Sequence, residues 1–183
     1  MARAEKKIEH TELDSYISFS QPMTVQLGKL LGGVCEPGDV IVLTGDLGAG
    51  KTQLTKGIAQ GLGIDQDVTS PTFTIEMVYE GTLDLYHFDL YRLHDALELE
   101  DTGLFDVLEE DGVCVIEWGE QFQDEIGPNR LDIFLTRADD LAEAGKEPPR
   151  KMRLVAHAPR GKAMIEALDR AFCAESAHGA LEE

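Results

Sequence analysis

The stretch Gly45-Asp-Leu-Gly-Ala-Gly-Lys-Thr52 decides the fold of this chain. It fits the pattern G-x-x-x-x-G-K-[ST], in which glycines free the backbone so that successive N–H groups can point toward a polyphosphate. Lys51 supplies a cation for the β- and γ-phosphates, and the Thr52 hydroxyl is a hard oxygen ligand suited to Mg²⁺. The expected phosphate- and nucleotide-contacting residues of this segment are Gly45, Asp46, Leu47, Gly48, Ala49, Gly50, Lys51, Thr52 and Gln53.

The neighbours of this loop supply the strand and the helix that it needs. Residues 39–44 form a short apolar run rich in β-branched side chains, which is typical of a buried strand. Residues 51–62 carry leucine or isoleucine at every fourth position on one helical face, and the start of that helix favours an anion. An ordinary glycine-rich turn would fit the same order, but it leaves the Lys51-Thr52 pair unexplained.

The whole pattern predicts a single α/β domain over residues 1–183, with a mixed parallel and antiparallel sheet flanked by helices. The expected helices are one that starts at Ser20, followed by Pro22, and runs to about Leu31, then 51–62, 94–110 with an interruption at Gly103, and 162–172. The expected strands are 11–19 at a sheet edge, 72–79 and 83–89 as a hairpin, 113–118, 131–136 and 152–157. Residues 137–150 are expected to form an exposed loop, and 174–183 a flexible tail.

Composition limits the possible partners and the compartment. The chain has 35 acidic and 16 basic residues, so its net charge of −19 repels phosphate backbones and makes direct, tight binding to nucleic acid unexpected. No apolar run approaches the ~20 residues that span a bilayer, and the charged N-terminus lacks the apolar core of a signal peptide. Cys35, Cys114 and Cys173 have no zinc-site spacing and are expected to be free thiols in a cytoplasmic protein.

Two acidic residues are candidates to work with the loop, because each ends a predicted strand. Glu117 follows the apolar run 113–116, where a buried carboxylate is costly unless it is paired or near a metal, so it is expected to serve Mg²⁺ with Thr52. Asp89 ends the segment 83–89 and is expected to orient a water molecule or a metal-bound water. The alternatives are a salt bridge for Glu117 and pairing with Arg92 for Asp89.

Two further positions lie close to these acids in the sequence. His87, on the same strand face as Asp89, is expected to be a hydrogen-bonded structural histidine. Ser70-Pro-Thr72 lies one loop past the predicted helix, where P-loop enzymes place a segment that senses the γ-phosphate. Ser70 and Thr72 are therefore added to the expected nucleotide contacts, and the alternative is a simple turn leading into a strand.

Four segments together resemble the TsaE (YjeE) family of small bacterial P-loop ATPases. They are residues 45–52, Thr69-Ser-Pro-Thr-Phe-Thr74, Tyr86-His-Phe-Asp-Leu-Tyr-Arg92 and Ile116-Glu-Trp-Gly-Glu120. The resemblance extends over about residues 40–120, and little is recognisable beyond Gln121. Gln53 stands where many members have a second threonine, but it follows the essential Thr52.

This resemblance implies an activity that composition does not reveal. Family members act in making threonylcarbamoyladenosine in tRNAs that read codons beginning with A. They bind the TsaB–TsaD complex, and their Mg²⁺-dependent ATP hydrolysis supports repeated turnover without their being the transferase. Matched by motif, Lys51, Asp89 and Glu117 are the expected catalytic residues, Thr52 and Glu117 the expected metal ligands, and ATP with Mg²⁺ the expected cofactors; tRNA is contacted only indirectly.

Two other kinds of P-loop enzyme remain as rival interpretations. A small-molecule kinase would need an acceptor pocket and usually an arginine-bearing lid, and the segment 137–150 is a weak candidate for one. A GTPase is disfavoured because the chain has no Asn-Lys-x-Asp motif. A nucleotide-gated binding subunit, in which hydrolysis acts as a timer, overlaps with the family role.

Overall fold

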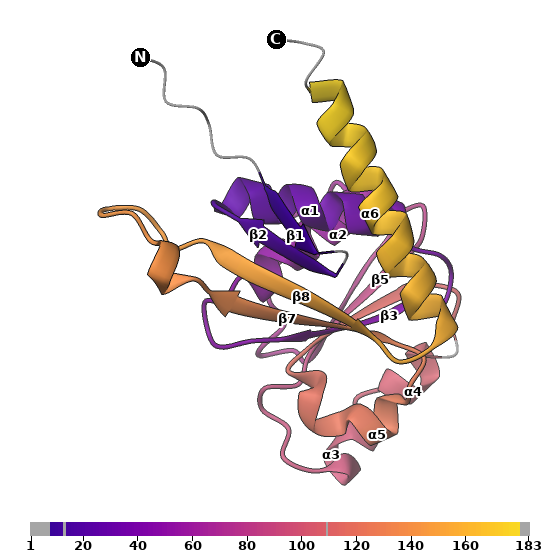
Figure 1. The fold of residues 1–183 in the computed structure, drawn as a ribbon. Coiled ribbons are helices and arrows are strands. Elements are labelled where there is room, and N and C mark those ends of the chain that lie inside the picture. The colour runs from indigo at the N-terminus through magenta and orange to yellow at the C-terminus, as the bar shows by residue number, and fades with distance from the viewer. Residues whose placement is uncertain (1–7, 13, 109, 180–183) are drawn as a thin grey trace, which may run out of the picture.

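A computed structural model describes residues 8–12, 14–108 and 110–179. Within these residues eight strands form one sheet in the order β1-β2-β8-β7-β3-β6-β5-β4 (Figure 1). Their bounds are β1 Glu9–Glu12, β2 Ser15–Ser18, β3 Val40–Thr44, β4 Glu76–Tyr79, β5 Leu85–Asp89, β6 Val113–Glu117, β7 Leu131–Arg137 and β8 Arg150–Ala156. The strands β7, β3, β6 and β5 are parallel and the outer pairs are antiparallel, so the predicted mixed sheet is confirmed.

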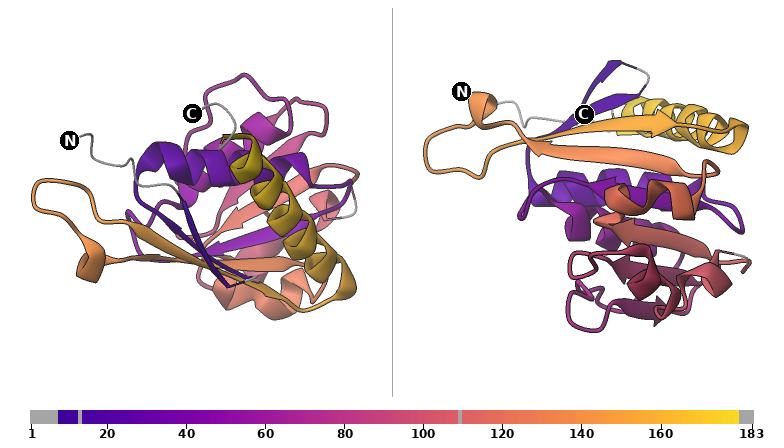
Figure 2. Two further views of the ribbon diagram at one scale, coloured as in Figure 1. Left: turned by 45° about the horizontal axis from the view of Figure 1, so that its top comes forward. Right: turned by 90° about the horizontal axis from the view of Figure 1, so that it is seen from below.

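Helices cover both faces of the sheet (Figures 1 and 2). They are α1 Gln21–Gly33, α2 Lys51–Gly61, α3 Ala96–Glu100, α4 Leu104–Val107, α5 Gln123–Ile126 and α6 Pro159–Gly179, with two short 3₁₀ turns, η1 Gly119–Phe122 and η2 Asp139–Leu141. The apolar side chains of β6 alternate between two cores. Val115 packs on the side of α1, α2 and α6, and Ile116 packs on the side of α3, α4 and α5.

The first helix begins where the sequence predicts. Ser20 is extended at the N-cap, its side chain accepts a hydrogen bond from the Met23 N–H at 3.4 Å, and Pro22 follows in the first turn. The predicted end near Leu31 is two residues short, because Gly32 and Gly33 continue the helix. Gly32 is a point of close approach to α2, since a Cβ there would overlap the carbonyl oxygen of Ile58.

Three other predicted elements are corrected by the structure. Within the predicted strand 11–19, residues 11–12 belong to β1 and 15–18 to β2, and these two strands pair antiparallel instead of forming one edge strand. Helix 94–110 is two short helices, α3 and α4, because Gly103 between them has a φ of 79°. Residues 174–179 continue α6 as helix, so the predicted flexible tail does not begin at 174, and its last residues, 180–183, lie outside the described part of the chain.

The predicted strand 72–79 is also shorter than expected. Residues 72–75 form a turn in which the Thr74 and Ile75 N–H groups donate to the Pro71 carbonyl at 3.1 and 2.7 Å. Ile75 has a φ of 71°, which is unusual for a β-branched residue, and β4 begins only after it. The turn holds the Ser70-Pro-Thr72 segment at the end of β5.

The segment between β7 and β8 is the predicted exposed loop. Most of its side chains are exposed and it projects beyond the rest of the sheet (Figure 2). Its two ends are anchored, because the Ala138 N–H donates to the Pro149 carbonyl at 2.8 Å and the Arg150 side chain is buried. Among the described helices, none is both long enough and apolar enough to cross a membrane.

Candidate functional site

The glycine loop lies at the carboxyl edge of the parallel strands, where open α/β sheets bind their ligands. Residues 45–50 lead from the end of β3 into α2, and Ala49 N–H closes a turn on the Asp46 carbonyl at 3.0 Å. Gly48 and Gly50 have φ angles of 78° and 105°, which a residue with a Cβ adopts only with strain. No side chain caps the start of α2, so its first N–H groups are available to an anion.

Lys51 begins α2 and turns its ammonium group back into the loop. Nζ donates to the carbonyl oxygens of Gly45 at 2.5 Å and Asp46 at 3.1 Å, and it lies 3.9 Å from the centroid of the Trp118 ring. Burial lowers the pKa of Lys51, while the carboxylates of Glu117, Glu120, Asp89 and Asp46 act in the opposite direction. The loop thus holds a buried cation whose partners are its own carbonyls and an aromatic face.

Glu117 is bound directly to the second key residue of the loop. The Thr52 hydroxyl donates to Glu117 Oε1 at 3.0 Å, and His87 Nε2 lies 2.9 Å from the same oxygen. The register of β3 with β6 explains the contact, because Leu43 pairs with Glu117 and the loop begins two residues later. Glu117 is 2% exposed, and its contacts with Thr52 and His87 offset the cost of its burial. The contact with His87 is within ion-pair distance, so it also fits the salt bridge considered as an alternative.

Asp89 lies beside Glu117 but binds a different segment. The two residues pair in register between β5 and β6. Asp89 Oδ2 accepts hydrogen bonds from the hydroxyls of Ser70 at 3.0 Å and Thr72 at 2.7 Å, and Oδ1 accepts from the Tyr91 N–H at 3.0 Å. The alternative partner Arg92 has its guanidinium 5.8 Å from the Phe73 ring. Asp89 therefore fastens the segment 70–72 to the sheet.

The structure brings the expected residues together at one edge. The loop, Thr52, Lys51, Glu117, Asp89, Ser70 and Thr72 form a continuous set of contacts, and Gln53 follows half-buried on α2. Trp118 completes the set: it leaves β6 with a φ of 62°, and its ring lies between Lys51 and Tyr91, whose ring centroid is 5.0 Å away. The sequence shows that Trp118 is next to Glu117, but it does not show that the Trp118 ring lies against the Lys51 ammonium.

Two neighbours of the loop escape sequence reasoning. His87 is buried and hydrogen-bonded, as expected, but its partner Glu117 is revealed only by the register of β5 with β6. Arg150 lies at the start of β8, with its Cγ 3.7 Å from where a Cβ on Gly50 would stand. Its guanidinium donates to the Pro148 carbonyl at 2.6 Å and to Glu147 at 3.4 Å. No local motif connects it with a loop one hundred residues earlier.

The donor set at the loop fits Mg²⁺. A hydroxyl and a carboxylate supply hard oxygen ligands, and Mg²⁺ usually binds through one or two carboxylates together with substrate phosphates. In the described part of the chain, no group of three or more His, Cys, Asp or Glu side chains forms a self-sufficient metal site. Thr52 and Glu117 would therefore hold the ion jointly with a nucleotide.

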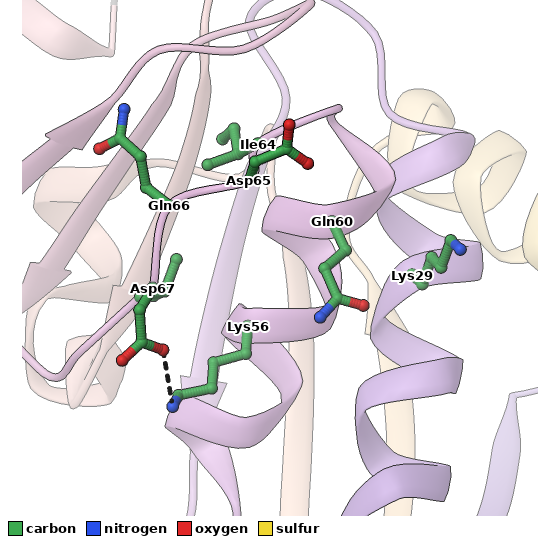
Figure 3. A pocket seen from close by; sticks show the side chains of 8 residues that line it. Lys29, Lys56, Gln60, Ile64, Asp65, Gln66 and Asp67 are labelled. Carbon is green, nitrogen blue, oxygen red and sulfur yellow. Dashed lines mark hydrogen bonds and ion pairs between the residues drawn. The ribbon is translucent and has the colours of Figure 1, made fainter.

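A separate pocket of about 450 Å³ lies between α1, α2 and the residues that follow α2 (Figure 3). It is lined by Lys29, Lys56, Gln60, Ile64, Asp65, Gln66, Asp67 and Val68. Lys56 reaches across it to Asp67 at 3.2 Å. The pocket shares no residue with the glycine loop or with Glu117 and Asp89. The Lys56 side chain is partly exposed and that of Asp67 is exposed. For both reasons the pocket is not the candidate site.

Strand, glycine loop and helix in this order, with an acid from the adjacent parallel strand on the threonine, define a P-loop protein. Comparison with known proteins gives the family. Residues 19–145 match the family model described as threonylcarbamoyl adenosine biosynthesis protein TsaE. The chain belongs to the TsaE family, which this description places in threonylcarbamoyladenosine biosynthesis.

Individual relatives agree with this assignment. The chain is 48% identical over 118 residues to the tRNA threonylcarbamoyladenosine biosynthesis protein TsaE of Bacillus subtilis, covering 64% of this chain and 73% of that one. It is 47% identical over 119 residues to the protein of the same name from Treponema pallidum, covering 65% and 88%. The crystal structure of Bacillus subtilis YdiB matches with a TM-score of 0.71 at 33% identity, over 91% of this chain and 98% of that one.

Proposed function

We propose that this protein binds ATP with Mg²⁺, hydrolyses it, and thereby supports repeated turnover of the TsaB–TsaD complex in making threonylcarbamoyladenosine in tRNAs that read codons beginning with A. The observation that carries the proposal is the contact of Thr52 with Glu117 beside the buried ammonium of Lys51. A hydroxyl, a carboxylate and a cation at a helix start are the groups that a Mg²⁺–nucleotide requires.

Each group has a distinct part in binding. The N–H groups of the loop and of the first turn of α2 receive the phosphates, and Lys51 exchanges the Gly45 and Asp46 carbonyls for β- and γ-phosphate oxygens. Thr52 and Glu117 would hold Mg²⁺, which would neutralise charge on the phosphates and draw electron density from the γ-phosphorus. The hydrogen bond from Thr52 already holds the Glu117 carboxylate beside the Thr52 hydroxyl, the other proposed ligand of the ion.

Hydrolysis requires a water molecule in line with the γ-phosphate. Water attacks the γ-phosphorus, the bond from that phosphorus to the bridging oxygen breaks, and ADP and phosphate leave. Asp89 orients this water by accepting a hydrogen bond from it. Because Ser70 and Thr72 occupy Asp89 Oδ2 in the structure, the segment 70–72 moves away from Asp89 when the γ-phosphate is bound.

Exposed apolar side chains around the site support a protein partner. Leu47 at the tip of the loop is 89% exposed, Phe73 beside Thr72 is 87% exposed, and Tyr91 is 59% exposed. Large exposed apolar groups gathered at a functional edge are typical of an interaction site. We assign this edge to the TsaB–TsaD complex, so that the partner senses the position of the segment 70–72. With a net charge of −19, contact with tRNA is indirect.

The compartment proposed is the cytoplasm. The three cysteines are free, and burial raises the pKa of the Cys35 and Cys114 thiols, so both stay as unreactive thiols. A reducing compartment is where unpaired cysteines of this kind persist.

The test is an ATPase assay with and without purified TsaB–TsaD, combined with a modification assay in which tRNA exceeds TsaB–TsaD. We expect phosphate release that needs Mg²⁺ and no small-molecule acceptor, and several modified tRNAs per TsaB–TsaD only when ATP-competent protein is present. ADP formation that requires a small-molecule acceptor and yields the phosphorylated acceptor instead of free phosphate would favour the kinase alternative. Multiple turnovers without this protein would contradict the proposed role.

A further inference from the structure

His87 is a fully buried side chain with a single directed contact. It lies on β5, is 0% exposed, and its Nε2 is 2.9 Å from Glu117 Oε1. A carboxylate can only accept, so Nε2 carries the hydrogen and donates it. The other ring nitrogen, Nδ1, is buried and has no hydrogen-bond partner among the described residues. A histidine needed only for packing would not leave one nitrogen unsatisfied in order to aim the other at a carboxylate.

The contact is part of a line of three side chains. Thr52 Oγ1, on α2, and His87 Nε2, on β5, both bind Glu117 Oε1, at 3.0 and 2.9 Å. Glu117 Oε2 is only 3.4 Å from Thr52 Oγ1 and makes no closer hydrogen bond with the described residues. One oxygen of the carboxylate is therefore held by two hydrogen bonds, and the other has only the longer contact with Thr52.

The strand register makes this arrangement rigid. His87 pairs with Val115 on β6, which places it diagonally next to Glu117 on the same face of the sheet. The partners of the two acids are also separate, because His87 binds Glu117 whereas Ser70 and Thr72 bind Asp89. A change at His87 thus acts on one acid only.

We propose that His87 is a positioning residue for the Mg²⁺–nucleotide site: by donating Nε2–H to Glu117, it fixes the carboxylate in the orientation that binds the metal with Thr52. The inference rests on the proposed function, since Glu117 has a metal ion to bind only if the protein binds Mg²⁺ with a nucleotide. Hydrogen bonds from second-layer residues to metal ligands set ligand orientation, and their loss typically costs about 10–100-fold in metal affinity. His87 does not touch the nucleotide and is not a catalytic residue.

The test compares His87→Leu, which removes the donor, with His87→Gln, which keeps an N–H donor at the end of a side chain of similar length. Leu85→Val, a mild change on the same buried face of β5, controls for lost packing. Calorimetry measures the affinity for a non-hydrolysable ATP analogue in EDTA and over a Mg²⁺ series, and thermal melting verifies folding.

For His87→Leu we expect about 10–100-fold more Mg²⁺ to be needed at half-saturation, with affinity in EDTA within about twofold of wild type. His87→Gln is expected to recover most of the loss, and Leu85→Val to keep the wild-type Mg²⁺ dependence. A folded His87→Leu with wild-type Mg²⁺ dependence would overturn the role of His87. Wild-type protein that binds no analogue would overturn the proposed function instead.

A second measurement does not depend on the variants folding. Nitrogen-15 NMR of the imidazole in wild-type protein distinguishes a protonated from an unprotonated ring nitrogen. We expect Nε2 to carry a hydrogen. A ring with hydrogen on Nδ1 alone could not donate to Glu117 and would overturn the proposal.

Discussion

Two acids at the ends of neighbouring strands have different environments, and this difference separates their roles. Glu117 is bound to Thr52 of the P-loop and to His87, whereas Asp89 is bound to Ser70 and Thr72. One acid thus lies at the P-loop, where we propose that Mg²⁺ binds, and the other holds the segment expected to respond to the γ-phosphate. The two residues are register partners on β5 and β6, so their different roles cannot be told from strand position alone.

Replacing each acid should give a different kinetic phenotype. Glu117→Ala should weaken Mg²⁺-dependent nucleotide binding and hydrolysis together, because it removes a metal ligand. Asp89→Ala should leave binding within a few-fold and lower kcat by about 10²-fold or more, the range of a lost group that positions a proton acceptor or water. Calorimetry and steady-state ATPase assays on both variants check this, and normal hydrolysis by Asp89→Ala would show that its assigned role is wrong.

Trp118 should report nucleotide binding by its fluorescence. It is the only tryptophan, and the Lys51 ammonium lies 3.9 Å from its ring centroid. We expect the phosphates of a bound nucleotide to draw that ammonium away, so the emission intensity or wavelength should change on titration with Mg²⁺–ATP. Trp118→Phe provides the blank. Unchanged emission at nucleotide concentrations that saturate the protein in calorimetry would mean that Lys51 keeps its place over the ring.

At the scale of elements, the P-loop helix owes its position to a glycine contact with α1. Gly28 and Gly32 of α1 face Gly57 and Gly61 of α2, and a Cβ at any of the four would overlap backbone of the other helix. Because α2 begins at Lys51, this packing sets the height of the P-loop against the sheet. The contact thus links the packing of two helices to the geometry of the site.

Gly57→Ala should therefore destabilise the protein, whereas Gly33→Ala should not. At Gly57 a Cβ meets the Val25 carbonyl oxygen, and forcing the helices apart should cost about 1–3 kcal/mol or more of unfolding free energy. At Gly33, also in α1, a Cβ meets nothing within 4 Å, and alanine favours the helix by up to about 1 kcal/mol. Urea unfolding of both variants measures the difference, and equal stability would refute the close-packing explanation.

Sequence reasoning succeeded where signals are local and failed where partners are distant. The P-loop, the N-cap at Ser20 and the buried strand β6 follow from short patterns, and the structure places them as expected. Residues 72–75 have strand-forming side chains, but hydrogen bonds to Pro71 and from Thr72 to Asp89 turn them away from the sheet. The contacts of His87 and Arg150 depend on register and on a hairpin far along the chain, which no local pattern encodes.

At the scale of the whole molecule, net charge and exposed apolar side chains bear on which partners we propose. A net charge of −19 opposes tRNA phosphates, while the apolar side chains of Leu47, Phe73 and Tyr91 are exposed at the nucleotide edge. The molecule is therefore suited to a protein partner at this edge. The segment 70–72, fastened to Asp89 in the structure, is the element whose position that partner would read.

Affinity for TsaB–TsaD should depend on the bound nucleotide. A ligand shifts a conformational equilibrium only by its difference in affinity for the two states, so the partner must prefer one position of residues 70–72. We expect different dissociation constants for the forms with an ATP analogue, with ADP and without nucleotide, measured by surface-immobilised binding. The same affinity in all three forms would remove the switch, and tight binding of the isolated protein to bare tRNA at physiological salt would overturn the charge reasoning.

The most direct test of the central claim is a calorimetric titration of Mg²⁺–ATP into wild-type protein and into Lys51→Ala, with Lys56→Ala as the matched control. Lys56 lies on the same helix but faces Asp67 at the separate pocket. We predict saturable 1:1 binding for wild type and Lys56→Ala, and at least about tenfold weaker binding for Lys51→Ala, since charge-assisted hydrogen bonds contribute about 1.5–3 kcal/mol. Unchanged ATP affinity in a folded Lys51→Ala variant would contradict the assignment of residues 45–52 as the phosphate-binding loop.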